Sequence, residues 1–129
     1  MLATTAGAVA ALVNMIGMGF DTTDANTGNW QLYRNDGTGT ATKVDLGSGA
    51  ARNTTHGFDL VIFCAPGAAT TIFVRVTNIY TGTVVLDTSY TTDIPAVDTG
   101  LAYKAECNNG AVASAQNVEV AKVYIETDY

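Results

Sequence analysis

The chain of 129 residues has few charged side chains, and few of those are positive. Charged residues make up 14% of the sequence, whereas they make up about a quarter of an ordinary globular protein. The six Lys and Arg residues are scattered from Arg34 to Lys122, and the net charge is -6. Because binding to a phosphate backbone needs clustered cations, nucleic acid is not an expected partner.

Residues that commonly carry catalysis are also scarce. The single histidine, His56, has no G-x-S-x-G or H-E-x-x-H motif to accompany it. Glu119 and Glu126 lie near opposite ends of one predicted strand, which does not suit the paired carboxylates of a glycosidase. We therefore expect no enzymatic activity, no catalytic residues and no cofactor.

Cysteine is nearly absent, and the sequence has no long apolar run. Cys64 and Cys107 lack a nearby histidine cluster, so they do not predict a zinc site. We expect two buried free thiols, with a disulfide as the alternative. No apolar run reaches the length of a membrane span. Residues 1–18 lack the positive start and the cleavage site of a signal peptide, so we expect them to belong to the fold.

What the sequence does contain is typical of β-strands joined by turns. Hydrophobic residues make up 47%, which is normal for a folded domain. Residues 29–34 form an alternating run with Trp30 and Leu32 on one face. Asp36-Gly37 follows and favours a tight hairpin turn, and residues 41–46 alternate as the returning strand.

Further strands are expected along the rest of the chain. Residues 58–65 are almost continuously apolar, which predicts a strand covered on both faces. Residues 71–79 alternate, with Ile72, Val74 and Val76 on one face. Other strands are expected over residues 8–20 (with an amphipathic helix as the alternative), 84–90, 101–107 and 118–126. The sequence therefore predicts one all-β domain over residues 1–129, a jelly-roll-like antiparallel β-sandwich of about eight strands.

Two kinds of residue are candidates for ligand binding. Trp30 and Tyr33 are the predicted contacts, because an aromatic ring can stack on a sugar, although Trp30 also suits a β core. Asp21, Asp24 and Asn26 could supply oxygen ligands to calcium from one loop. That loop lacks the alternation of an EF-hand and its terminal Glu, and such residues also favour turns. We expect no metal site there.

The sequence resembles a domain found in virion proteins of tailed bacteriophages. The resemblance rests on NWQLYRNDGTGTATKVDLG (residues 29–47), on DLVIFCAPG and TIFVRVTNIYTG (within residues 59–82), on a late Asn-Asn-Gly turn and on the ending VYIETDY. It extends over residues 19–129. Such domains occur in tail fibres, spikes and related appendages. The resemblance implies a β-sandwich, commonly trimeric, on the virion exterior, in contact with other virion proteins and with a host glycan or surface protein.

The leading hypothesis is a non-enzymatic fibre or spike head used in host attachment. Its ligand contacts would come from strand-end loops, because loops carry binding on a rigid scaffold. One alternative is a capsid decoration (cement) protein, which the short chain beginning at Met1 favours because a fibre head normally follows a long shaft. The other alternative is a free carbohydrate-binding module.

Overall fold

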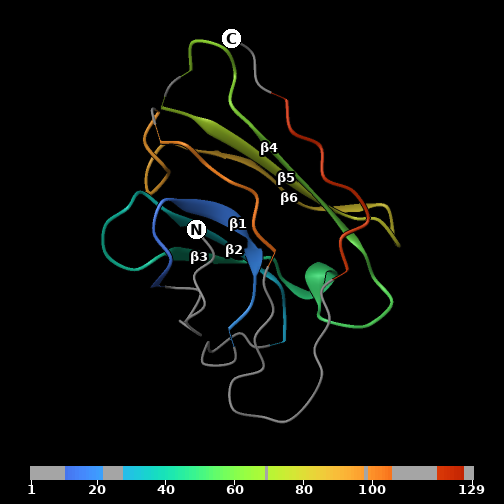
Figure 1. Cartoon of the computed structure of the whole chain (residues 1–129). Coiled ribbons are helices and arrows are strands. Elements are labelled where there is room, and N and C mark those ends of the chain that lie inside the picture. The colour runs from blue at the N-terminus through green and yellow to red at the C-terminus, as the bar shows by residue number, and fades with distance from the viewer. Residues whose placement is uncertain (1–10, 22–27, 69, 98, 106–118, 127–129) are drawn as a thin grey trace. The chain divides into compact units, whose positions relative to one another are not determined.

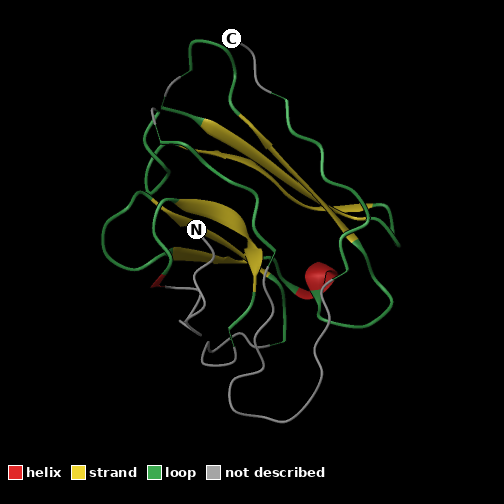
Figure 2. Cartoon of the chain, in the orientation of Figure 1, coloured by secondary structure: helices red, strands yellow, loops and turns green. Residues whose placement is uncertain are grey.

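The computed structural model describes residues 11–21, 28–68, 70–97, 99–105 and 119–126. The chain divides into two compact units, one formed by Met1–Ala6 with Gly100–Tyr129 and the other by Gly7–Thr99. All the strands found in the described residues belong to the Gly7–Thr99 unit. The short helix η2 (Ser48–Ala50) is a single 3-10 turn in the same unit (Figure 2). The prediction of an all-β protein is confirmed.

The first sheet has the strand order β1 (Met15–Gly19), β2 (Gln31–Asn35) and β3 (Thr42–Asp45), and both pairings are antiparallel (Figure 1). The hairpin between β2 and β3 is confirmed. The turn of this hairpin depends on Gly37, because its φ of 103° is a conformation that glycine adopts readily and that strains other residues. The Asn35 Oδ1 accepts the backbone N–H of Gly37, which fixes the turn next to the end of β2.

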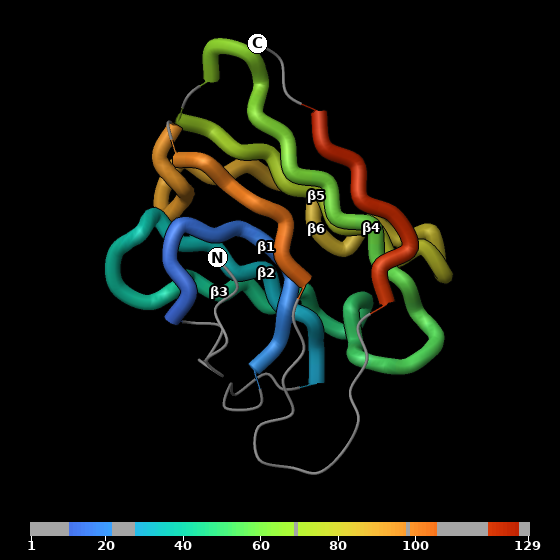
Figure 3. The backbone as a smooth tube through the Cα atoms, in the orientation of Figure 1, coloured from blue at the N-terminus to red at the C-terminus, as the bar shows by residue number. Residues whose placement is uncertain are grey.

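The second sheet has the order β4 (Phe58–Phe63), β5 (Ile72–Asn78) and β6 (Thr83–Tyr90), again antiparallel. Figure 3 follows the backbone from β5 into β6 through a tight turn at residues 79–82. A register shift opposite Val76 and Thr77 leaves Val85 as an extra residue in β6. Such a bulge lets two successive residues point toward the same side, and both Val85 and Leu86 pack against the core.

One hydrophobic cluster contains side chains from both sheets. Burial of a side chain such as Leu32 or Val76 contributes roughly 1.5–3 kcal/mol, so this cluster is the main source of stability of the Gly7–Thr99 unit. Every strand of both sheets contributes to it or packs against it. Its buried members are Leu32, Leu46, Ala50, Ile72, Val74 and Val76.

One expectation about the strands is wrong, and another is not confirmed. The covering of β4 on both faces is wrong, because Val61 and Phe63 are exposed and β4 is an edge strand. The number of about eight strands is not confirmed, since the described residues form six, and residues 101–105 and 119–126 form none. In both segments apolar and polar residues alternate, but all of these residues are exposed, so neither the apolar nor the polar side chains are buried. Alternation specifies a strand only where another backbone and a core are available to it.

Candidate functional site

The second sheet turns an apolar face to solvent, on the side opposite the core. We call this the outer face. The rings of Phe63 on β4 and Phe73 on β5 are direct cross-strand neighbours, with centroids 6.3 Å apart. Single exposed apolar residues are normal, whereas a contiguous group of them marks an interaction surface. The exposed apolar residues of the outer face, with their exposed fractions, are Val61 (46%), Phe63 (51%), Phe73 (45%) and Val84 (39%).

Charged residues of both signs share the outer face with these side chains. Arg75 lies on β5 between Val61 of β4 and Asp87 of β6, and Asp59 lies opposite Thr77. Arg75, Asp59 and Asp87 are exposed. Within the described part of the chain, none of the three forms an ion pair. The outer face thus combines apolar surface with one cation and two carboxylates that are open to other partners.

A second exposed feature is the turn between β5 and β6, together with His56. We call His56, Tyr80, Thr81 and Thr83 the hairpin tip. The imidazole of His56 and the ring of Tyr80 are stacked, with centroids 4.7 Å apart and planes 16° from parallel. Tyr80 is nevertheless 71% exposed, which leaves most of its ring open to solvent.

Asn78, which is buried at the end of β5, holds the hairpin tip in place. Its Oδ1 accepts the backbone N–H groups of Tyr80 (3.1 Å) and Thr81 (3.3 Å). Its Nδ2 donates to the carbonyl of Gly49 (3.0 Å) and lies 3.1 Å from Nδ1 of His56. The two N–H groups fix the orientation of the amide, so Nδ2 must donate to His56. Nδ1 is then the acceptor, and the neutral imidazole carries its proton on Nε2.

The two aromatic residues predicted to bind a ligand do not share a surface. Trp30 packs against the core at its margin, with its ring centroid 5.1 Å from that of Phe20 and 6.2 Å from that of Phe58. Tyr33 is fully buried on the side of β2 opposite Leu32. Tyr33 therefore has no surface to offer a ligand in this structure, and Trp30 has the surroundings of a core residue.

The structure describes only some of the residues considered as metal ligands or as thiols. Asp21 is half-buried, whereas Asp24 and Asn26 lie outside the described residues. No group of three His, Cys, Asp or Glu side chains in the described ranges is arranged to hold a metal ion. Cys64 is a free thiol and exposed, so its predicted burial is wrong; it follows the end of the edge strand β4. Cys107 lies outside the described residues.

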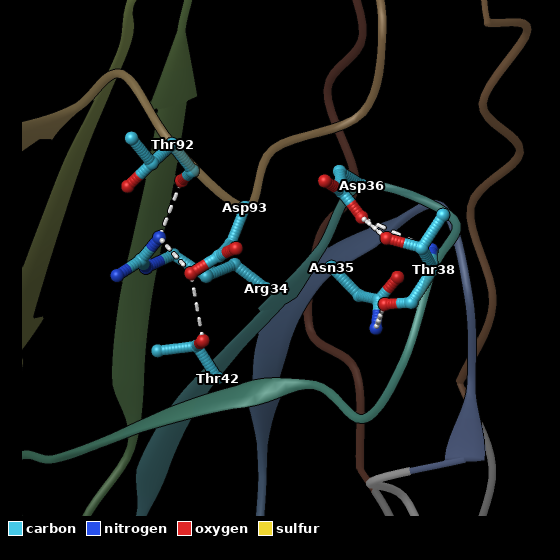
Figure 4. A network of polar contacts seen from close by, with 7 residues as sticks. All are labelled: Arg34, Asn35, Asp36, Thr38, Thr42, Thr92 and Asp93. Carbon is cyan, nitrogen blue, oxygen red and sulfur yellow. Dashed lines mark hydrogen bonds and ion pairs between the residues drawn. The ribbon is translucent and has the colours of Figure 1, made fainter.

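Figure 4 shows a polar network that joins the first sheet to the segment following β6. The Arg34 guanidinium lies 4.3 Å from the centre of the Tyr90 ring, and its Nη1 donates to the Thr92 carbonyl and lies 3.4 Å from Asp93 Oδ2. The same oxygen of Asp93 accepts the Thr42 hydroxyl at 2.8 Å. The Asp93 carboxylate thus links Arg34 of β2 and Thr42 of β3 to the segment after β6, and we call this network the clamp.

The comparisons with known proteins found no family model, no curated protein and no solved structure that matches the chain. No helix in the described residues is long and apolar enough to span a membrane. The two surface features therefore rest on the geometry alone. The alternation of residues 71–79 was the available sequence signal for the outer face, since it places Phe73 and Arg75 opposite the core residues.

Proposed function

We propose that the chain is a non-enzymatic structural protein on the exterior of a tailed-phage virion, a fibre or spike head involved in host attachment. We also propose that the chain folds as a jelly-roll-like β-sandwich. Two antiparallel sheets with a common core support a sandwich. The sequence resemblance over residues 29–47 and 59–82 supports the virion setting.

The outer face is the observation that carries the proposal. Its exposed Phe63 and Phe73 favour burial against another protein surface. We propose that the surface which covers it is another copy of this chain. Because Arg75 lies on the same face as Asp59 and Asp87, copies arranged around a symmetry axis can pair the cation of one with a carboxylate of the next. A trimer is the favoured assembly, in line with the resemblance.

The assembly is tested by analytical ultracentrifugation of the full chain and of a Phe63→Ser/Phe73→Ser variant. The wild type should sediment as an oligomer and the variant as a monomer, because the variant loses the apolar contact and keeps the core. Val97→Ser is the matched control, since Val97 is 74% exposed and belongs to no strand of the second sheet. A monomeric wild type, or an oligomer that the double substitution leaves unchanged, contradicts this use of the outer face.

The virion setting is tested by mass spectrometry and cryo-electron microscopy of purified particles of the phage that encodes the chain. Density for the chain at the tail, in few copies, supports the fibre or spike head. Density over the capsid, in many copies, supports the alternative of a decoration protein, in which capsid subunits cover the outer face. Absence of the chain from the particles contradicts both.

The second alternative, a free carbohydrate-binding module, is favoured by the hairpin tip. An exposed aromatic ring held in a fixed orientation is suited to stacking on a sugar, whether or not the chain belongs to a virion. Sugar binding by a chain that is absent from phage particles would favour this alternative over the virion protein.

A further inference from the structure

We propose that the hairpin tip binds the apolar C–H face of a neutral pyranose sugar. The ring of Tyr80 is the stacking surface, and Nε2–H of His56 is the adjacent hydrogen-bond donor. The proposal rests on the proposed attachment function for its biological setting, while its chemistry follows from the contacts of the tip itself.

The stacking surface is exposed and its orientation is fixed. Tyr80 is 71% exposed although its ring is stacked on the imidazole of His56. The backbone N–H of Tyr80 donates to the buried Asn78 side chain, and the turn closes with a bond of 2.8 Å from the Gly82 N–H to the Asn78 carbonyl. A ligand therefore does not have to order the ring when it binds, which removes part of the entropic cost of association.

The donor is also oriented in advance. Nδ1 of His56 accepts the hydrogen bond from Asn78, which assigns the imidazole proton to Nε2. No described residue accepts a hydrogen bond from Nε2. Because the imidazole covers one face of Tyr80, a pyranose stacks on the opposite face, and a hydroxyl substituent reaches this N–H only by extending past the edge of the tyrosine ring. Flat apolar contact with a neighbouring polar group is the combination that a pyranose requires.

The charge of the tip selects a neutral ligand. Residues 53–57 and 78–84 contain no Asp, Glu, Lys or Arg. A phosphate or an acidic sugar would find no cation to pair with in these segments. The remaining side chains at the end of the turn, Thr81 and Thr83, are exposed and offer hydroxyl groups.

The proposal is tested by titrating the full chain, labelled with ¹⁵N, with methyl β-D-galactopyranoside and with methyl β-D-glucopyranoside. For at least one of the two sugars, the amide signals of Tyr80, Thr81 and His56 should shift with a dissociation constant on the order of 1 mM, a value usual for a ligand of this size on an open surface. Tyr80→Ala should abolish these shifts, whereas Tyr80→Phe should retain them. His56→Ala should weaken binding about tenfold, because it removes both the donor and the support of the ring.

Tyr124→Ala is the matched control, because Tyr124 is 73% exposed and is absent from the hairpin tip. It should bind both sugars like the wild type. The proposal is overturned if neither sugar shifts the tip signals, if Tyr80→Ala binds as well as the wild type, or if Tyr124→Ala abolishes binding. Detection of the chain in phage particles together with a negative titration would refute this site and leave the proposed function standing.

Discussion

The two sheets bury their central strands to different extents. In the first sheet, β2 is buried on both faces, with Leu32 in the core and Tyr33 fully enclosed on the opposite side. In the second sheet, β5 buries Val74 and Val76 and leaves Phe73 45% exposed. Burial on both faces makes the first sheet a scaffold, whereas the second sheet contributes one face to the fold and leaves the other free for a partner.

The largest expected effect comes from Tyr33→Ala. Removing a fully buried aromatic side chain leaves a cavity and should lower the free energy of unfolding by about 3–5 kcal/mol. Phe73→Ala, at the half-exposed position of the other sheet, should cost a monomer less than half of that. Urea denaturation followed by circular dichroism measures both. Equal losses for the two variants would mean that the outer face is as important to the fold as the enclosed side of β2.

Gly49→Ala is expected to come next, because Gly49 lies against β6 of the second sheet. A Cβ at this position would lie 2.9 Å from Cγ1 of Val85, so the valine would have to move within the core margin. We expect a loss of about 1–3 kcal/mol from this overpacking. Gly28→Ala is the control, since its Cβ would meet nothing within 4 Å. A Gly49→Ala variant as stable as Gly28→Ala would contradict the close approach of η2 to β6.

The clamp between the first sheet and the segment after β6 should have a smaller effect. Asp93→Ala removes the carboxylate that accepts from Arg34 and Thr42, and it places alanine at a φ of 50°. Because Asp93 is 48% exposed, we expect a loss of only about 1–2 kcal/mol, measured by thermal and urea unfolding. Asp93→Asn tolerates this φ and keeps an acceptor oxygen, so it should lose less. An equal loss in both variants would show that the negative charge itself is what stabilises the clamp.

The smallest effect should come from the turn of the first sheet, and it depends on pH. Hydrogen bonds from the side chain and backbone of Thr38 hold the pKa of Asp36 below its usual value of 3.8. A carboxyl with a lowered pKa stabilises the fold above its unfolded-state pKa, and this contribution disappears as the pH falls through the folded-state pKa. The stability difference between wild type and Asp36→Asn should therefore shrink below about pH 4. A difference that grows on acidification would contradict the hydrogen bonds to Thr38.

The fold was predictable wherever local patterns and turn chemistry agreed. The β2–β3 hairpin follows from alternation around Asp36-Gly37, and β5 follows from Ile72, Val74 and Val76. The exposure of β4 was not predictable, because a continuous apolar run is compatible both with a strand covered on two faces and with a strand that has one exposed apolar face. Residues 101–105 alternate as β5 does, and they form no strand because alternation does not supply a pairing partner.

The candidate site was less predictable than the fold. Trp30 and Tyr33 are candidates by their aromatic character alone, and in the structure Trp30 packs against the core while Tyr33 is fully buried. Tyr80 is equally aromatic, and it becomes a candidate because it lies in a turn and is stacked on His56, which is 24 residues away in sequence. Residue type alone does not distinguish an aromatic ring in a core from one on a surface.

The sequence by itself determined the β class, the β2–β3 and β5–β6 turns and the inward faces of β3 and β5, because these depend on the conformational preferences of neighbouring residues. Only the tertiary structure decided which apolar residues remain exposed and which distant polar groups meet. The outer face exists because the second sheet packs only one of its sides against the core, and the hairpin tip exists because Asn78 joins the β5–β6 turn to Gly49 and His56. Both depend on contacts between segments far apart in the chain, which no local pattern encodes.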